Sequence, residues 1–528
     1  MQNIGIDLAD FEYIRKNNLI YVDKTEFLYK IVSENKYYFL SRPRRFGKTL
    51  FVDTLEKFYQ GKKDLFEGLY ISNQDLDWEK HPVIRLDFNE IISQTTEQLK
   101  IVLTEKLIDY ANQYNLELTS TYVPTKFNEL IKKISKKTKH GVVLLVDEYD
   151  KPILSHFGVI EGSINKIRTA RANQNFLKLV YDNLKPLEPY LEKVFITGVT
   201  KFSKLSIFST LNNLIELDQN EEFAEIMGYT EKELDEYFSP YFSKLAEKNN
   251  LTISECRNKF KQMYNGFRFT EKDSRVYNPF SVGNALKNAD FDNYWFESGT
   301  PTFLVELIKN KNFDLSNLEN IEVGKNEIKA YDIGNIQIIP LLFQTGYLTI
   351  KEIEDQVIYK LDYPNYEVEN SFNLNLAKSF SQNKITVPVV HRLKKLLINK
   401  ELEKFIQQIK SIFFSLVNIN IPKSLQDREA YYNSLFYLIT TLLTDNNLNV
   451  YSEVLTSEGR IDSIVETDTN IYIIEFKANQ GAEIALQQIK DKNYAERFKI
   501  KDKGIILIGT NFDTEKRNIK DTKIEEID

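Results

Sequence analysis

The sequence predicts an α/β protein of several domains: a mostly parallel sheet with a phosphate-binding loop, a helical lid, a small winged unit and a second α/β domain. Three observations support this prediction. Short apolar runs alternate with helix-like segments from residue 37 to about 200, a GKT tripeptide follows the first run, and the last hundred residues return to strand patterns around acidic residues and a lysine. Strand–helix alternation is typical of parallel sheets with helices on both faces.

Composition places the chain among folded globular proteins. Its 528 residues allow several domains, and 42% hydrophobic with 27% charged residues is typical of a folded chain. The formal net charge of −7 argues against a protein that coats nucleic acid over its whole surface, but it leaves room for a local basic cleft. The single cysteine, Cys256, excludes a disulfide framework and a thiolate zinc site, and the four histidines match no zinc-ligand spacing.

The sequence gives no sign of membrane targeting. The N-terminus, MQNIGIDLADFEYIRKNN, lacks the apolar stretch of a signal peptide, and no run of about 18 apolar residues predicts a membrane span. We therefore expect a cytoplasmic protein without a membrane partner. Assembly into a homo-oligomer stays open.

Four apolar runs in the first part of the chain predict buried strands. They are YYFL (37–40), VIRLDF (83–88), VVLLVD (142–147) and VFITGV (194–199). The segments between them, such as TEQLKIVLTEKLIDYANQY, carry apolar residues at helical spacing. We expect residues 1–215 to form one domain around a mostly parallel sheet.

The remaining chain divides by pattern into three further domains. Residues 216–325 are mostly helical in pattern and are expected to form a lid, whereas 326–420 combine a winged-helix-like unit with a helical connector. Residues 421–528 return to strands. The basic run at 131–141 is explained better as a helix end stopped by Gly141 than as a nucleic-acid patch, because lysines in a last turn complement the helix dipole.

The stretch SRPRRFGKT follows the first predicted strand and precedes a helix, which is the context of a phosphate-binding loop. Gly47 would let the backbone approach a phosphate, Lys48 would neutralise the β- and γ-oxygens, and the Thr49 hydroxyl would ligate Mg²⁺. Arg42 stands where such a loop normally opens with glycine. Taken alone, the tripeptide therefore leaves a structural turn as an alternative.

A second half of the nucleotide site is predicted about 100 residues later, where VVLLVDEYDKPI ends a strand in two acids. Asp147, at the carboxyl end of a neighbouring parallel strand, can reach the Mg²⁺ of the phosphate loop. Glu148 is suited to orienting and deprotonating the attacking water. The alternative is a pair of acids that cap a helix. Thr197, near the end of the fourth strand, could sense the γ-phosphate.

The C-terminal strands predict a second metal site. Asp462 and Glu475 lie 13 positions apart, as on two strands of a hairpin, and alternation puts Glu475 and Lys477 on the same face. Two carboxylates there can hold Mg²⁺, while the lysine orients water or stabilises developing charge. Solvated cross-strand pairs are the alternative. Further candidates are Glu429 as a metal ligand, Glu453 on a neighbouring strand, and a downstream helix with Gln488, Lys490 and Tyr494.

The set YVDKT, SRPRRFGKTL, VDEYDKPI and FITGVTKFSKLSIFSTLNNL resembles the AAA-ATPase-like family of bacterial proteins. Members of that family join a PD-(D/E)XK nuclease to the C-terminus of the ATPase, and RPRRFGKT is their usual phosphate loop. The resemblance therefore implies a nucleotide site despite Arg42, with ATP and Mg²⁺ as cofactors. It adds Arg44, Arg45 and Phe46 to the expected cofactor-binding residues.

The segments GRID, YIIEFKA, QQIKDKNYAERF and GIILIGTNFD resemble the family's nuclease domain. The resemblance implies that Glu429, Asp462 and Glu475 are metal ligands and that Lys477 joins the last two in catalysis. Two positions depart from the family. Lys201 stands where arginine is common and lacks the bidentate fork of an arginine finger, and Asn433 stands where histidine is frequent.

The resemblance extends to two less informative regions. Asp23, Lys24 and Thr25 would flank the adenine, with a helix cap at Asp23 or Thr25 as the alternative. Aromatic residues around Trp295 are better explained as packing between lid helices than as a platform for bases.

These features predict an ATP-binding and ATP-hydrolysing protein with a metal-dependent nuclease domain that cleaves nucleic acid, with DNA favoured over RNA. Gating of cleavage by ATP is a hypothesis that rests on the shared chain. One alternative is an ATP-dependent switch with a catalytically inactive nuclease-like domain that binds DNA. Another is a scaffold that binds nucleotide without turnover.

Overall fold

The computed structural model describes residues 2–91, 93–156, 164–201, 207–208, 210–297, 302–311, 313, 315–318, 321–328, 337–415, 434–444, 448–456, 459–516 and 518–527. These residues form two compact units. The first combines Met1–Phe303 with Glu322–Val368, and the second combines Leu304–Ile321 with Glu369–Asp528. No helix among the described residues is both long and apolar enough to cross a membrane.

The first unit is built on a parallel sheet with the strand order β2-β3-β4-β1-β5. Its strands are β1 (Tyr37–Ser41), β2 (Val83–Asp87), β3 (Val142–Asp147), β4 (Leu191–Gly198) and β5 (Ile215–Glu216). Every residue of β1 and β3 is buried, which explains their continuous apolar sequences. The predicted α/β fold and its four longer strands are confirmed.

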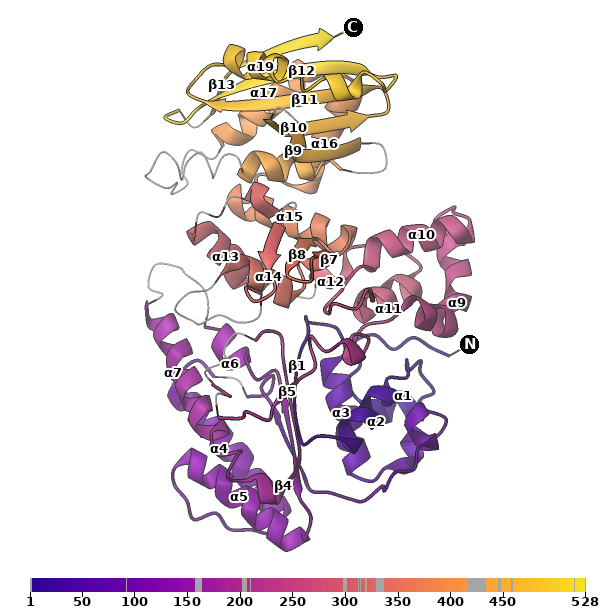
Figure 1. Ribbon diagram of the computed structural model, residues 1–528, viewed down its shortest axis with the longest axis vertical. Helices are drawn as coiled ribbons and strands as arrows, with labels where there is room; N and C mark the ends of the chain where they lie inside the picture. The colour runs from indigo at the N-terminus through magenta and orange to yellow at the C-terminus, as the bar shows by residue number, and fades with distance from the viewer. Residues whose placement is uncertain are drawn as a thin grey trace. The chain divides into compact units, whose positions relative to one another are not determined.

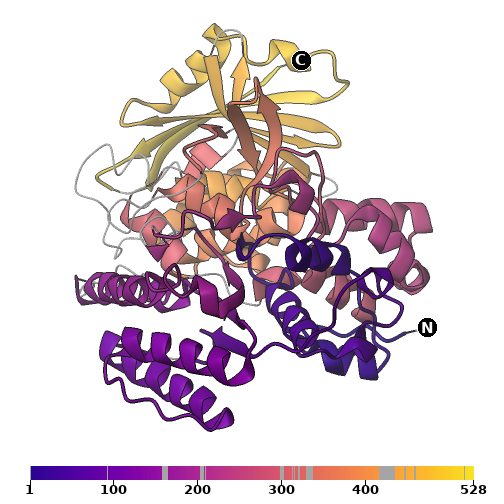
Figure 2. The same cartoon turned by 60° about the horizontal axis from the view of Figure 1, so that its bottom comes forward.

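Helices cover both faces of this sheet. They are α1 (Phe11–Lys16), α2 (Thr25–Ser33), α3 (Lys48–Tyr59), α4 (Thr96–Gln113), α5 (Val123–Thr138), α6 (Lys151–Leu154) and α7 (Ile164–Tyr181), with short 3₁₀ turns η1 (Lys63–Phe66), η2 (Tyr70–Asn73), η3 (Glu188–Tyr190) and η4 (Glu221–Phe223). In Figure 1, α1–α3 lie on one side of the strands and α4, α5 and α7 on the other, and Figure 2 shows the same two groups in a second view. A large apolar core fills the space between the sheet and α4, α5 and α7.

The basic run at 131–141 is a helix end, as the sequence predicts. Lys136 and Lys137 lie in the last turn of α5, and β3 starts shortly afterwards at Val142. The left-handed residue that ends the helix is Lys139 (φ 64°) rather than Gly141. Glycine is needed at 141 for a different reason, because a Cβ there would lie 2.8 Å from the backbone nitrogen of Glu192.

A helical lid and a small winged unit complete the first unit. The lid contains α9 (Glu231–Lys248), α10 (Ile253–Tyr264), α11 (Pro279–Asn288) and α12 (Tyr294–Glu297), which share an apolar core. Thr230 and Thr252 begin α9 and α10 with capping boxes. The winged unit consists of α14 (Ile338–Thr345) and a small sheet in the order β6-β8-β7, formed by β6 (Ile321–Gly324), β7 (Thr349–Glu354) and β8 (Ile358–Asp362).

The second unit is built on a mixed sheet with the order β13-β12-β11-β10-β9. Its strands are β9 (Leu448–Thr456), β10 (Gly459–Thr467), β11 (Asn470–Ala478), β12 (Gly504–Asp513) and β13 (Asn518–Ile527). Its helical segments include most of α13 (Thr302–Asn310) and α15 (Tyr366–Phe380), then α16 (Val387–Ile398), α17 (Leu402–Phe414), α19 (Ala482–Asp491), η5 (Leu315–Leu318) and η6 (Glu496–Phe498). The β11–β12 pair is parallel and the other pairs are antiparallel. The crossover between β11 and β12 contains α19, whose apolar face packs on the sheet.

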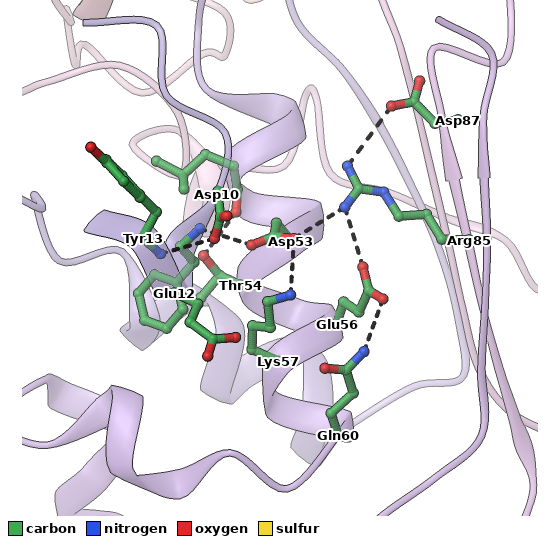
Figure 3. Close-up of polar contacts among 12 residues, drawn as sticks. Asp10, Glu12, Tyr13, Asp53, Thr54, Glu56, Lys57, Gln60, Arg85 and Asp87 are labelled. Atoms are coloured by element: carbon green, nitrogen blue, oxygen red, sulfur yellow. Dashed lines mark hydrogen bonds and ion pairs between the residues drawn. The ribbon is translucent and has the colours of Figure 1, made fainter. Parts of the chain in front are cut away.

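Helix α3 is tied to its surroundings by the Asp53 carboxylate, as Figure 3 shows. Asp53 accepts a hydrogen bond from the backbone N–H of Phe11 at the start of α1 (2.8 Å) and one from Arg85 of β2 (3.2 Å). Arg85 also pairs with Glu56 of α3 (3.2 Å). Burial opposes the charge of Arg85, but the carboxylates of Glu56 and Asp53 outweigh burial and raise its pKa. This network fixes α3 against the N-terminal segment and the sheet.

We predict that Asp53→Ala destabilises the first unit by about 3 kcal/mol, because it leaves the buried Phe11 N–H without an acceptor and removes a partner from Arg85. Asp53→Asn should cost less, since an amide oxygen can still accept from Phe11. Trp78 packs on Phe58 of α3 (ring centroids 4.8 Å apart), so its fluorescence in a Trp295→Phe background can follow urea unfolding. Asp109→Ala, at an exposed position of α4, is the control and should change stability by less than about 0.5 kcal/mol. Equal stability of the Asp53 and Asp109 variants would contradict this role.

Candidate functional site

Residues 42–47 connect β1 to α3 and form the predicted phosphate-binding loop. Gly47 has a left-handed backbone (φ 91°) directly before α3, and a Cβ on it would meet no atom within 4 Å. Gly47 and the first residues of α3, Lys48 and Thr49, line a cavity, where the positive end of the helix dipole favours an anion.

The loop lines a cavity of about 750 Å³. Arg44–Thr49 form one part of its wall, and further parts come from the N-terminal segment with Leu8 and Val22 and from the lid boundary with Met227 and Tyr229. The volume and the mixture of apolar and charged walls suit a small polyanionic ligand with an apolar portion. A nucleotide has this character.

Lys48 and Glu148 meet at the cavity although 100 residues separate them. The Lys48 ammonium donates to the carbonyls of Arg42 (3.0 Å) and Pro43 (3.1 Å), and its Nζ lies 3.2 Å from Oε1 of Glu148. Only 3% of the Lys48 side chain is exposed. Buried charged groups in proteins are paired, and the loop carbonyls and Glu148 are the partners that hold the Lys48 ammonium beside the place where phosphates would bind.

Asp147 lies at the end of β3, completely buried. Its Oδ1 accepts a hydrogen bond from the Thr197 hydroxyl at the end of β4 (2.5 Å), while its Oδ2 has no hydrogen-bond partner among the described residues. Burial, together with the charge of Glu148, raises the pKa of Asp147, and the hydroxyls of Thr197 and Thr49 oppose this shift. A Mg²⁺ ion bound by Asp147 and Thr49 would use Oδ2 of Asp147 and offset the free-energy cost of burying the carboxylate. These residues therefore fit the metal predicted there.

Asp150, which the sequence prediction missed, fixes the turn that carries Glu148. Its buried carboxylate accepts hydrogen bonds from the backbone (2.8 Å) and hydroxyl (2.8 Å) of Thr200, just after β4. Burial, reinforced by the charge of Glu148, raises the pKa of Asp150 to about 6. Glu148 itself has a left-handed backbone (φ 53°). The third acid in VDEYD was the available signal, since a buried acid needs such donors.

Arg42 explains why this loop can open without glycine. Its side chain is buried and turns away from the cavity, donating to the carbonyls of Ser41 (2.9 Å) and Asp218 (3.0 Å) and lying 4.4 Å from the ring centre of Phe269. Burial lowers the pKa of Arg42 to about 10. Arg42 thus anchors the start of the loop to the segment after β5.

The other loop residues point in different directions. Arg45 lines the cavity, is paired with Asp7 of the N-terminal segment, and lies 5.0 Å from the ring centre of Phe280. Arg44 is exposed at the cavity wall. The Phe46 ring is buried beside Phe267 (4.9 Å), so its backbone rather than its ring is available to a phosphate. Their roles with a nucleotide remain predictions.

The lid and the winged unit hold the loop from outside the cavity. The indole N–H of Trp295 donates to the carbonyl of Arg44 (3.0 Å), and the backbone N–H of Trp295 donates to the buried carboxylate of Glu367 (2.7 Å). Burial raises the pKa of Glu367 to about 8. Gly346, which ends α14, packs so closely on Pro43 that a Cβ would lie 2.6 Å from the proline ring. No local sequence pattern pointed to these contacts.

Three residues considered in the sequence analysis are already paired with other groups. Lys201 is buried and forms ion pairs with Asp218 and with Glu216 (3.3 Å), so its charge is directed at the segment around β5. Asp23 accepts from the backbone of Thr25 (2.8 Å), but Lys24 holds the cap position of α2 and no side chain among the described residues caps this helix, so the predicted cap at Asp23 or Thr25 is wrong. Lys24 lines the cavity but pairs with Glu233 of the lid (2.6 Å).

The second unit brings together Asp462, Glu475 and Lys477. Ser463 of β10 pairs with Ile474 of β11, so Asp462 and Glu475 are the next opposed residues of this antiparallel pair. The Lys477 ammonium lies 3.2 Å from Oε1 of Glu475, and Gln488 of α19 donates to the same oxygen. Asp462 accepts from the backbone N–H of Phe476 (2.7 Å). Convergence of the two carboxylates on one metal ion stays a prediction.

Helix α19 can place Gln488 over Glu475 because β12 has Gly509 beneath it, where a Cβ would lie 2.4 Å from the carbonyl oxygen of Ala482. The other two helix candidates lie elsewhere. Lys490 is paired with Glu525 of β13 (2.7 Å), and Tyr494 is buried in the core under α19.

The metal ligands predicted in this unit are only partly within the described residues. Asp462 and Glu475 supply two carboxylates, which are ligands that Mg²⁺ prefers while it keeps several waters. Glu429 and Asn433 lie outside the described residues, as does the side chain of Glu453. Within the described part of the chain, no group of three or more His, Cys, Asp or Glu side chains could hold a metal. Two carboxylates with Lys477 beside them fit a hydrated Mg²⁺ ion that the substrate would help to bind.

Comparison with known proteins matches each site to a family. Residues 3–208 match the family described as a predicted AAA-ATPase, and residues 427–522 match the PD-(D/E)XK nuclease superfamily. The chain is also 33% identical over 536 residues to a protein of Azotobacter chroococcum mcd 1 described as an uncharacterized protein in the vnfD 5′ region. That alignment covers 100% of this chain and 99% of the relative.

We predict that Trp295 fluorescence reports occupancy of the cavity, because its indole N–H binds the carbonyl of Arg44 in the loop. The chain has two tryptophans, so Trp78→Phe leaves Trp295 as the only indole. Adding ATP with Mg²⁺ should change the emission of this variant with a saturable dependence on ATP. Trp295→Phe, which keeps only Trp78, is the control and should not respond. Saturated ATP binding, measured by calorimetry, without a change in Trp295 emission would refute the link.

Proposed function

We propose that this chain, which belongs to the AAA-ATPase-like family with a C-terminal domain of the PD-(D/E)XK nuclease superfamily, hydrolyses ATP and cleaves nucleic acid with a metal-dependent site. The meeting of Lys48 with Glu148, the residue after Asp147 at the carboxyl edge of the parallel sheet, is the observation that best supports the ATPase half. Because ATP is abundant in the cytoplasm, we propose the cytoplasm as the location of this protein.

In the ATPase half, the triphosphate would lie on the backbone N–H groups at the start of α3. The Lys48 ammonium, now shared with Glu148, would turn to the β- and γ-oxygens, which releases the Glu148 carboxylate. Glu148 would then take a proton from the water that attacks the γ-phosphorus, while the bond to the β–γ bridging oxygen breaks and ADP leaves. Mg²⁺, held by Thr49 and Asp147, would supply charge neutralisation at the phosphates.

In the nuclease half, Asp462 and Glu475 would hold Mg²⁺, which supplies a Lewis acid and an activated water at the phosphodiester. Lys477 would orient that water or stabilise the charge that develops on the phosphorus oxygens. We favour DNA as the substrate. The alternative is an ATP-dependent switch with an inactive nuclease-like domain. One observation supports this alternative: among the described residues, the site offers two carboxylates and no third metal-binding side chain.

For the ATPase half, Lys48→Ala should weaken ATP binding about 10- to 150-fold, since charge-assisted contacts contribute about 1.5–3 kcal/mol. Glu148→Gln should bind ATP but hydrolyse it about 10²- to 10⁴-fold more slowly, because it removes the general base. Calorimetry and phosphate release measure the two effects. Glu105→Gln, at an exposed position of α4, is the control. Unchanged phosphate release in Glu148→Gln would instead favour a scaffold that binds nucleotide without turnover.

For the nuclease half, Glu475→Ala should abolish Mg²⁺-dependent cleavage of DNA, because one of two metal-binding carboxylates is lost. Cleavage of supercoiled and linear DNA is followed on gels, and RNA is tested in parallel. Glu483→Ala, at an exposed position in the first turn of α19, is the matched control. Cleavage that survives in Glu475→Ala would show that the site is assigned wrongly.

The same assay tests coupling. If ATP gates the nuclease, wild-type cleavage should depend on ATP and Lys48→Ala should lose that dependence. Equal cleavage by both proteins, with and without ATP, would remove the coupling hypothesis and leave the two activities independent.

A further inference from the structure

Asn511 of β12 has a buried side-chain oxygen without a hydrogen-bond partner. Its amide nitrogen donates to Oδ1 of Asp521 on β13 (2.6 Å), whereas Oδ1 of Asn511 has no partner among the described residues. Only 2% of Asn511 is exposed. Because a buried acceptor without a donor costs free energy, such an atom needs an explanation.

The direction of this oxygen is fixed by Asp521. Asp521 also accepts from the backbone N–H of Ala482 at the start of α19 (2.9 Å). Burial alone would raise the pKa of Asp521, but the donors at Ala482 and Asn511 outweigh burial and lower it. An ionised carboxylate only accepts hydrogen bonds, so the amide nitrogen must face Asp521 and the amide oxygen must face away. A register shift directly after Asn511 marks a bulge, which is a device that aims side chains beside functional sites.

Register places Asn511 next to the nuclease lysine. In the parallel β11–β12 pair, Lys477 is the partner of Asn511 and Glu475 is the partner of Gly509. Register partners in neighbouring strands share a face of the sheet, and the strands lie about 4.8 Å apart. The vacant acceptor of Asn511 therefore belongs to the same face as the Glu475 carboxylate and the Lys477 ammonium.

The present partner of Lys477 is the Glu475 carboxylate, which is a predicted metal ligand. Oε1 of Glu475 accepts from both Lys477 and Gln488. A divalent cation on the Glu475 carboxylate would repel the Lys477 ammonium from it. The half-buried Lys477 then needs another acceptor, and a strand neighbour offers one that is empty.

We propose that Asn511 is a positioning residue of the nuclease: its side-chain oxygen accepts Lys477 when a metal ion binds Glu475, and it holds the ammonium at the scissile phosphate. This inference rests on the proposed nuclease function. Asp521 would act through Asn511 by fixing the direction of the amide. Neither residue touches the reacting atoms.

The first test needs no catalysis. Lys477 acylation by an amine-reactive reagent is measured by mass spectrometry, without nucleic acid, in EDTA and in Mg²⁺. In EDTA, Asn511→Leu should label like the wild type, because Glu475 still holds the lysine. In Mg²⁺ it should label about tenfold faster than the wild type, because the displaced ammonium has lost its acceptor. Equal labelling of the two proteins in Mg²⁺ would overturn the proposal.

The second test is the rate of DNA cleavage. Asn511→Leu should lower kcat about 10- to 100-fold with KM nearly unchanged, as losses of orienting partners do. Asp521→Asn, which keeps the bulk of the side chain but frees the amide of Asn511 to turn, should show a smaller loss of the same kind and also serves if Asn511→Leu fails to fold.

Thr510→Val is the matched control. Thr510 also has a buried hydroxyl without a partner, but it is adjacent to Asn511 on the strand and so faces the opposite side of the sheet. Its replacement should change neither labelling nor cleavage, and an equal loss in Thr510→Val would overturn the proposal. Wild-type protein that does not cleave at all would count against the proposed function, and the labelling result would still decide the role of Asn511.

Discussion

The burial of charge at the carboxyl edge of the parallel sheet is the constraint on which the first unit depends. Lys48 and Asp147 are almost completely buried, and isolated charges at such positions would cost several kcal/mol each. The loop carbonyls and Glu148 satisfy the lysine, and Thr197 satisfies one oxygen of Asp147. Because these partners come from the ends of different strands, the sheet must form in this order for the charges to be tolerated.

Around this charged centre, the phosphate loop is held mainly by packing and by carbonyl contacts. Arg42 and Phe46 extend outward into an aromatic group with Phe267 and Phe269, and Trp295 binds the carbonyl of Arg44. The lid and the winged unit therefore fix the loop backbone. The side of the loop that faces the cavity stays open for a ligand.

The second unit also pairs a buried carboxylate with a lysine on its own sheet. Its buried glutamate, Glu475, is paired with a lysine, as Glu148 is paired with Lys48. In both sites a lysine is paired with a carboxylate, and binding of a cation or a phosphate would exchange the partners. Sites arranged in this way need little reorganisation of charge when a ligand enters.

The sequence by itself determined the parallel sheet, the position of the phosphate loop and the opposition of Asp462 and Glu475. These features depend on local patterns: continuous apolar runs mark strands buried on both faces, and strand alternation decides which residues share a face. Only the tertiary structure decided that Arg42 turns away from the cavity, that Asp150 fixes the turn of Glu148, and that Lys490 pairs with Glu525 instead of facing the site. It also decided that Lys139 rather than Gly141 ends α5. Such choices follow from partners tens or hundreds of residues away, and the direction of a long charged side chain is set by the nearest acceptor in space, which no local pattern encodes.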